Sequence, residues 1–186
     1  LQEAIFIGAN FEGADLSNAN LKDATLKEAK LSRTNLRGAD LSGANLKKAN
    51  LFKANLSNAN LTNANLTGAN FEAADLSNAN LEEAKLYDAS FYRTNLTGAN
   101  LKETNLFDTY LQDANLSNAN LTRASFYNFS YTSNHREINK ANLKGLNLSE
   151  ANLKWANIKS IDLSKANLRG ADLSGANLEY SNLEGA

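Results

Sequence analysis

The sequence contains no cysteine, methionine or proline, and only one histidine among its 186 residues. Without cysteine the chain can form no disulfide, no thiolate metal site and no thiol nucleophile. The single histidine, His135, leaves little material for an imidazole-based site, because such sites combine it with further ligands or with a nucleophile. We therefore expect a non-enzymatic protein with no catalytic residues, no cofactor and no bound metal.

Long apolar runs and an excess of charge are also missing. No segment approaches the roughly 18 to 20 consecutive apolar residues of a membrane helix, so we expect no membrane association. Nineteen Lys and Arg residues stand against twenty Asp and Glu residues, which gives a formal net charge of -1. This balance provides no general attraction to nucleic acids, and we expect no direct nucleic-acid binding. No leader-like segment is visible, which favours a cytoplasmic location as an expectation.

A large apolar residue recurs at every fifth position from Leu1 to Tyr131, and again in a shifted phase from Ile138 to Leu183. A period of five matches neither the 3.6 residues of a helical turn nor the two-residue alternation of a strand. The repeating unit is therefore a short segment that turns a corner. This pattern predicts a solenoid, in which equivalent residues of successive coils lie above one another.

The repeating unit is Ala, then Asn or Asp, then Leu, followed by two mostly polar residues. The position two before the large apolar residue is Ala in 21 of the 26 units from Ala4 to Phe129. This indicates a narrow interior that receives one large and one small side chain per unit. The residue just before the large one is mostly Asn or Asp, as at Asn60 and Asn80. We interpret these residues as stacked corner amides, because Asn bonds to nearby backbone and tolerates unusual dihedral angles.

The run ANLSNANLTNANLTGANF from Ala54 to Phe71 resembles the pentapeptide-repeat protein family. The resemblance covers the chain except for a gap near residues 127–140. It implies an all-β fold, a right-handed four-sided (quadrilateral) parallel β-helix solenoid of about nine coils with four pentapeptides each. The period around the rod is then twenty residues. We accordingly expect residues 1–186 to form a single β-helix domain.

The main departure from the repeat is the segment YNFSYTSNHREINK, residues 127–140, in which the phase shifts by two residues. An inserted stretch in a stacked coil must leave the wall, so the segment is predicted to be a loop or bulge. A junction between two repeat blocks is the alternative. The segment carries His135 and Arg136, which we name as candidate partner-binding residues.

Aromatic residues at outward positions form a second departure. Sorted by the twenty-residue period, Tyr87, Phe107 and Tyr127 each follow a large apolar residue and are predicted to stack as a ladder on one face. Tyr92 and Tyr110 are placed on the next face. Large exposed apolar patches are typical of interaction surfaces. The alternative is that these rings only support the wall, as cross-strand pairs do.

Charge is uneven along the chain. Residues 22–53 carry eight basic and three acidic side chains, whereas residues 72–113 carry eight acidic and three basic ones. Opposite bands of this kind favour antiparallel pairing of two rods, so a homodimer through side or end contacts is expected. The alternative is that the bands are only solvated variation.

These features predict a protein-interaction or structural rod that binds an unidentified protein partner through the aromatic face, the 127–140 segment or both. The family resemblance also implies an alternative, a DNA-mimicking binder of DNA gyrase or topoisomerase. Mimicry of DNA requires phosphate-like charge density along a long face. Here the acidic band is short and follows a basic one, which favours the first interpretation.

Overall fold

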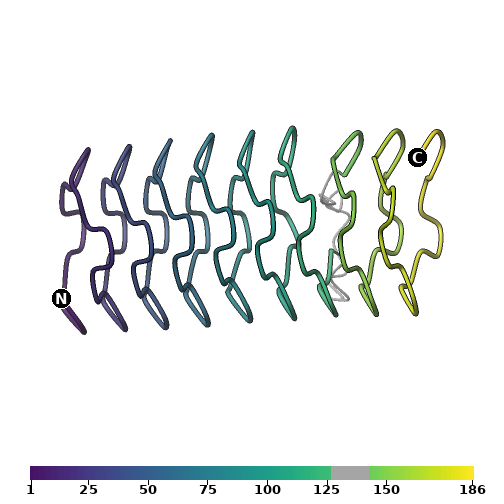
Figure 1. Ribbon diagram of the computed structural model, residues 1–186. Helices are drawn as coiled ribbons and strands as arrows, with labels where there is room; N and C mark the ends of the chain where they lie inside the picture. The colour runs from purple at the N-terminus through teal and green to yellow at the C-terminus, as the bar shows by residue number, and fades with distance from the viewer. Residues whose placement is uncertain (127–142) are drawn as a thin grey trace, which may run out of the picture.

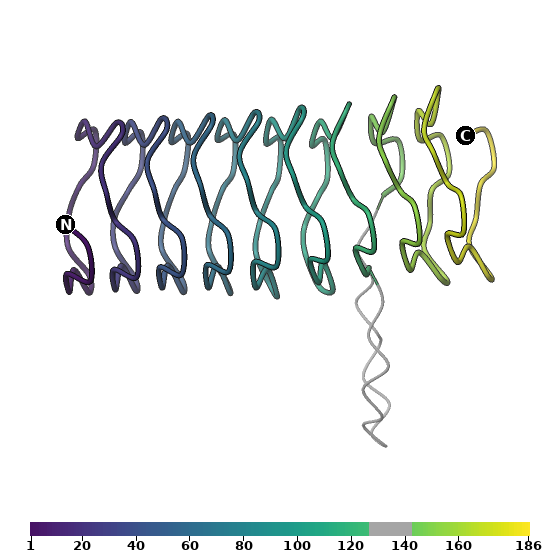
Figure 2. The same ribbon diagram turned by 60° about the horizontal axis from the view of Figure 1, so that its bottom comes forward.

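The computed structural model describes residues 1–126 and 143–186, which form a rod of stacked coils (Figure 1). The two ends of the chain lie at opposite ends of the rod, as a second view confirms (Figure 2). The described residues contain no α-helix and no extended strand. Instead, each pentapeptide contributes a single residue to a parallel β-ladder.

Each ladder residue pairs with the residue twenty positions later. Ile5 pairs with Thr25, for example, and Asn20 pairs with Asp40. Two hydrogen bonds join a typical pair of ladder residues in successive coils: the Leu21 N–H donates to the Asp40 carbonyl (2.7 Å), and the Asp40 N–H donates to the Ala19 carbonyl (3.0 Å). Four ladder positions fall within each twenty residues, so a coil has four pentapeptides and the rod has four walls, as predicted.

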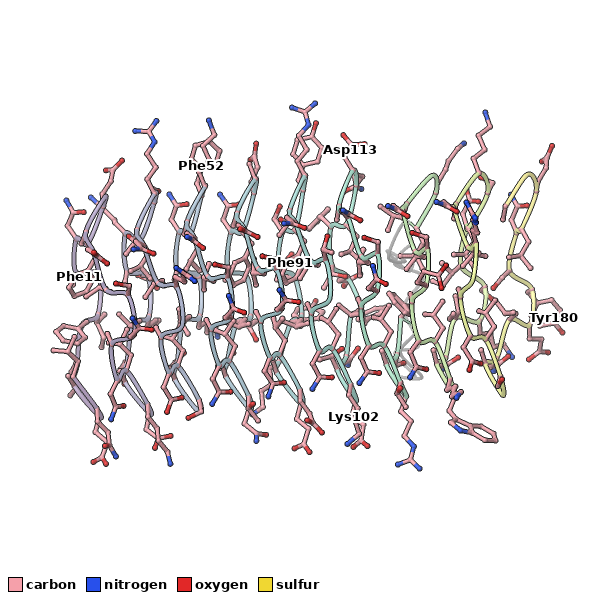
Figure 3. All side chains as sticks on the ribbon, in the orientation of Figure 1. Phe11, Phe52, Phe91, Lys102, Asp113 and Tyr180 are labelled. Carbon is pink, nitrogen blue, oxygen red and sulfur yellow. The ribbon has the colours of Figure 1, made fainter. Side chains whose placement is uncertain are left out.

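The interior is filled by the large apolar residue and the small residue of each unit. From Leu21 to Phe126 the large apolar residue that recurs at every fifth position is at most 1 % exposed. Figure 3 shows Phe91 inside the rod, where its ring stacks on that of Phe71 with centroids 5.0 Å apart. Burial of one leucine side chain contributes about 1.5 to 3 kcal/mol. Thr94 replaces Ala in the small column and remains satisfied, because its hydroxyl donates to the Phe71 carbonyl (2.7 Å).

Each corner is a four-residue turn that follows the large apolar residue. The Ala14 N–H donates to the Phe11 carbonyl (2.9 Å), and the second of the two intervening residues, Gly13, has a φ of 68°. A positive φ at this position alone is the signature of a type II turn. The same dihedral recurs at every fifth residue, including non-glycine residues such as Lys48 and Trp155.

The predicted placement of Asn and Asp at the corners is wrong, although the predicted stacks exist. These residues lie on the walls as ladder residues, and the positive φ falls three positions later. Their side chains start the turn, because the Asn10 Oδ1 accepts a hydrogen bond from the Glu12 N–H (3.0 Å). Asn100 donates to the Asn80 Oδ1 (2.9 Å), so the amides stack along the rod.

The turn pairs of successive coils line up as four edges, which we name after one residue each. The Lys102 edge comprises pairs 2–3, 22–23, 42–43, 62–63, 82–83, 102–103 and 122–123, and continues with 154–155 and 174–175. The Tyr87 edge comprises pairs 7–8, 27–28, 47–48, 67–68, 87–88 and 107–108, and continues beyond the undescribed residues with 159–160 and 179–180. The Tyr92 edge comprises pairs 12–13, 32–33, 52–53, 72–73, 92–93 and 112–113, and continues with 144–145, 164–165 and 184–185. The Thr97 edge comprises pairs 17–18, 37–38, 57–58, 77–78, 97–98 and 117–118, continues with 149–150 and 169–170, and lies diagonally opposite the Tyr87 edge.

The ladder continues on the far side of residues 127–142. Asn115 pairs with Asn147, and Ser125 pairs with Asn157, at a separation of 32 residues instead of twenty. The twelve additional residues correspond to two pentapeptides plus two residues, which accounts for the two-residue phase shift in the sequence. The predicted loop or bulge at 127–140 itself lies outside the described residues.

Candidate protein-binding surface

Two aromatic side chains stack on the Tyr87 edge. Tyr87 and Phe107 are the first turn residues of successive coils, and their ring centroids lie 6.1 Å apart with an interplanar angle of 23°. Tyr87 is 49 % exposed, and Phe107 is half-buried. The stack predicted from the twenty-residue spacing is thus present for these two rings. The third predicted member, Tyr127, lies outside the described residues.

A carboxylate lies against this stack. The Oδ1 atom of Asp108 is buried and accepts no hydrogen bond within the described residues. Burial raises the pKa of Asp108 above its usual value, partly opposed by a hydrogen bond from Tyr87. The charge of Asp108 in turn raises the pKa of Tyr87. The partial burial of Tyr87 and its hydrogen bond to Asp108 raise this pKa further. The edge therefore combines exposed ring faces with negative charge, an arrangement suited to cationic side chains.

The structure brings Tyr110, but not Tyr92, close to the stack. Tyr110 is the ladder partner of Ser90 on the wall that follows the Tyr87 edge, and it is 47 % exposed. Its proximity contributes to the raised pKa of Tyr87. Tyr92 lies on the Tyr92 edge, where the Arg93 guanidinium is 4.8 Å from its ring centroid. Figure 3 shows the same edge carrying Phe52 and Asp113, away from Lys102.

A shallow groove adjoins the stack on the wall between the Lys102 edge and the Tyr87 edge. It has a volume of about 340 Å³. Its lining comprises Thr67, Glu83, Ala84, Lys85, Leu86, Tyr87, Glu103 and Asn105. Sequence reasoning did not identify this groove. The available signal was the twenty-residue spacing of Glu83 and Glu103, which places two carboxylates one above the other along its rim.

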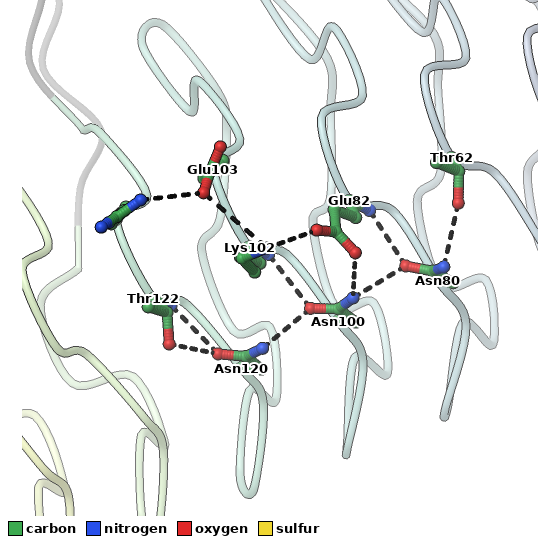
Figure 4. Close-up of polar contacts among 9 residues, drawn as sticks. Thr62, Asn80, Glu82, Asn100, Lys102, Glu103, Asn120 and Thr122 are labelled. Atoms are coloured by element: carbon green, nitrogen blue, oxygen red, sulfur yellow. Dashed lines mark hydrogen bonds and ion pairs between the residues drawn. The ribbon is translucent and has the colours of Figure 1, made fainter.

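The far rim of the groove is held by a polar network (Figure 4). The Lys102 Nζ bonds to the Glu82 Oε1 (2.7 Å), which raises the pKa of Lys102 and lowers that of Glu82. The Asn100 amide donates to Glu82 (3.2 Å), and Arg123 lies 3.4 Å from Glu103. These contacts link three successive coils, so the groove is lined by a fixed wall.

The other candidate residues, His135 and Arg136, lie outside the described residues. Across residues 1–126 and 143–186, no group of three or more His, Cys, Asp or Glu side chains is placed to hold a metal ion. No helix in these ranges could cross a lipid bilayer. The side chains of the stack and the groove are aromatic, carboxylate, lysine, hydroxyl, amide and aliphatic groups.

The sequence and the coil geometry define the class of protein. The sequence model for pentapeptide repeats matches eight copies, within residues 1–128 and 137–186. The chain belongs to the pentapeptide repeat family. Comparison with curated protein sequences gives no match.

Several solved structures are similar to this chain. HetL, a pentapeptide repeat protein involved in heterocyst differentiation regulation in the cyanobacterium Nostoc sp. strain PCC 7120, is 36 % identical, with 98 % of this chain and 84 % of HetL covered and a TM-score of 0.48. Full-length QnrB1, a plasmid-mediated fluoroquinolone resistance protein, is 20 % identical, with coverage of 97 % and 92 % and a TM-score of 0.49. A pentapeptide repeat protein from the Arabidopsis thaliana thylakoid lumen is 26 % identical, with coverage of 66 % and 72 % and a TM-score of 0.38.

Proposed function

We propose that this chain is a non-enzymatic protein-binding rod that uses the Tyr87 edge as its contact surface. The observation that carries the proposal is the stack of the exposed Tyr87 on the half-buried Phe107, beside the half-buried Asp108. Large aromatic side chains on a rigid surface lose little conformational entropy when they bind, which makes them frequent binding hot spots. The proposal includes the right-handed winding and the roughly nine coils implied by the family resemblance.

The contact surface can be tested by co-purification from the source organism followed by mass spectrometry. We expect Tyr87→Ala combined with Phe107→Ala to lose the protein partner while the circular dichroism spectrum stays unchanged. Phe52→Ala, which removes an aromatic residue from the Tyr92 edge, is the matched control and should retain the partner. Equal loss of fold and binding in the double variant would instead show that the rings only support the wall.

The 127–140 segment is the second proposed contact region. A variant lacking Thr132 to Glu137 separates its contribution from that of the Tyr87 edge. Loss of the partner only in this variant would assign binding to the segment that carries His135 and Arg136. Loss only in the aromatic double variant would assign binding to the edge.

Gyrase or topoisomerase binding by DNA mimicry is the alternative function. The acidic side chains of residues 72–113 do not form one continuous face, because Glu82, Asp88 and Asp113 lie on three different edges. Two of these three carboxylates are paired with a cation, Glu82 with Lys102 and Asp113 with Arg93. We therefore expect no effect of excess protein in a DNA supercoiling assay, whereas inhibition or protection of the enzyme would support the alternative.

A further inference from the structure

The Tyr87 edge changes its chemistry at Gly68. In the two coils on its amino-terminal side the first turn residues are Lys27 and Lys47, whereas in the two coils on its carboxy-terminal side they are Tyr87 and Phe107. Between them, Gly68 presents no side chain at the second turn position. Within two coils of Gly68, the amino-terminal part of the edge is thus rich in lysine, and the carboxy-terminal part is aromatic and acidic.

If a second, antiparallel copy of the edge is placed opposite the first with Gly68 at the centre, the lysines of one copy face the aromatic and acidic residues of the other. Lys48 and Asp88 occupy the same turn position as Gly68, one coil before it and one coil after it. Lys47 and Tyr87 have the same relation to Thr67 in the neighbouring column. Because each coil advances by about 4.8 Å, equal sequence offsets within a column are equal distances along the rod.

The same reversal pairs residues farther from Gly68. Lys27 and Phe107 each lie two coils from Thr67 on the Tyr87 edge. On the adjoining wall, Lys30 and Tyr110 each lie two coils from the ladder residue Asn70. Tyr87, Phe107 and Tyr110 therefore each have a lysine at the mirrored position, whereas Tyr180, farther along the same edge, lies beyond the range that the reversed edge covers.

We propose that a second copy of this chain binds along the Tyr87 edge in the antiparallel direction, with a twofold axis at Gly68. This inference rests on the proposed function, because it names the partner of the same aromatic surface. In such a pair, Lys47 of each copy faces Tyr87 of the other, and Lys48 faces Asp88. The contacts are cation–π interactions and ion pairs, each formed twice, as a closed twofold interface requires.

The side chains needed for this contact are available on the single chain. Lys47, Lys48 and Asp88 are exposed, and none of them forms an ion pair within the part of the chain that the structure describes. A β-carbon at Gly68 would lie 3.4 Å from the Lys48 Cγ and 3.9 Å from the Asp88 Oδ2. Both side chains thus flank Gly68, where the absence of a side chain lets two backbones approach closely.

The expected complex is weak and sensitive to salt. A contact along one edge falls in the smallest class of interfaces, below roughly 1,200 Å². Its charges are solvent-exposed, so they are screened beyond about 8 Å at 0.15 M salt. We expect dimers at micromolar concentrations in dilute buffer and their dissociation as salt increases.

A charge exchange between two variants tests the pairing. We expect Lys48→Glu and Asp88→Lys, purified separately, each to sediment at the monomer mass of 20.1 kDa, because like charges then meet twice. An equal mixture should recover the dimer, since Glu at position 48 of one chain faces Lys at position 88 of the other while the second native ion pair is retained. Both exchanges suit the turn dihedral, which Glu28 and Lys53 already adopt. Failure of the mixture to associate under conditions in which the wild type dimerises would overturn the proposed register.

A cysteine placed near the axis provides an independent readout, because the chain has no other thiol. Thr67→Cys should form a disulfide-linked dimer under mild oxidation. Thr97→Cys, at the equivalent turn position of the diagonally opposite edge, should stay monomeric. Equal cross-linking of the two variants, or a wild type that is monomeric throughout, would refute self-association on this edge. In that case the proposed function still stands if Tyr87→Ala with Phe107→Ala loses a different protein partner.

Discussion

The indole ring of Trp155 lies over Gly175, and a β-carbon on this glycine would overlap the ring. Both residues occupy the second turn position of the Lys102 edge, with φ values of 58° and 69°. Gly175 therefore meets two requirements, a positive φ and space for the ring above it. Trp155 remains 65 % exposed because only one of its faces is covered by the next coil.

Gly175→Ala is expected to destabilise the rod more than a substitution that changes only the turn dihedral. The matched control is Gly145→Ala, because Gly145 also has a φ of 69° but no atom within 4 Å of the position of a β-carbon. The control should lower the free energy of unfolding by about 1 kcal/mol. In urea titrations the Gly175 variant should lose more than this, and adding Trp155→Ala should remove the excess. Equal losses in the two single variants would contradict the role of the ring.

Ala64→Leu is expected to overpack the interior. Ala64 is fully buried in the small column, between the large residues of its own coil and the backbone of its neighbours. Extra methylene groups in a closely packed core cost about 1 to 3 kcal/mol. Ala73→Leu is the control, because Ala73 lies at an outward turn position and is half-buried. An unchanged melting temperature for the Ala64 variant would argue against a tightly packed small column.

The buried columns could be predicted from the sequence because their chemistry is uniform. Leu and Ala recur at fixed offsets, and a period of five leaves them only one common interior. The position with positive φ could not be found in this way, because its residues range from Gly175 to Lys48, Glu83 and Trp155. This diversity exists because the turn is imposed by the ladder bonds on both sides, which override the preference of any single residue. The abundant Asn residues led to a wrong prediction of where the turn lies, because they are ladder residues.

The aromatic stack could be predicted from the sequence, whereas the groove could not. The stack of Tyr87 and Phe107 follows from spacing, since side chains twenty residues apart must lie one above the other. The groove depends on how far Lys85, Tyr87 and Glu103 lean across the wall, which is set by side-chain conformation and ion pairing. The buried Oδ1 of Asp108 likewise has no sequence signal, because its environment comes from neighbours in adjacent coils.

Asn100→Ala is expected to weaken the amide column on the wall of the Lys102 edge. The Asn100 side chain donates to Asn80 and Glu82, and its Oδ1 accepts from Asn120 and from the Lys102 N–H. Each hydrogen bond contributes about 1 kcal/mol net, and water can replace some of the lost bonds in the variant. We therefore expect the free energy of unfolding to fall by about 1 to 3 kcal/mol.

Asn65→Ala is the control for the amide column. The Asn65 Oδ1 accepts only the local turn bond from the Thr67 N–H among the described hydrogen bonds. We expect it to cost less in the same chemical denaturation experiment. A larger loss at position 65 than at position 100 would show that the local turn bond, and not the column, stabilises the rod.

Asp108→Asn is expected to stabilise the protein at neutral pH. Burial raises the pKa of Asp108, so the folded chain binds this proton more tightly than the unfolded chain does. The free energy of unfolding therefore falls as pH rises from the usual Asp value through the raised one. Removing the ionisable group should abolish this loss and raise the melting temperature at pH values above that range, with little change in acid.

Asp172→Asn should show the opposite sign. Hydrogen bonds from Ser174, together with Lys154, lower the pKa of Asp172 to about 2. The stability from this carboxylate is present above its unfolded pKa and is lost as pH falls toward the folded value. Thermal melts of both variants between about pH 2 and pH 7 cover both ranges. The same direction of change in the two variants at neutral pH would contradict the assigned causes.

Deletion of residues 129–140 is expected to leave a continuous rod. The deletion joins Asn128 to Ala141, so that Phe126 is followed at the fifth position by Leu143 and the pentapeptide phase is restored. The ladder separation between Asn115 and Asn147 then becomes twenty residues, as in every other coil. Shortening a connection changes the closure entropy only slightly, so the melting temperature should be equal to or higher than that of the full chain. Unfolding or aggregation of the deletion variant would show that residues 129–140 contribute to the wall, whereas a folded variant that loses its protein partner would identify them as a contact region.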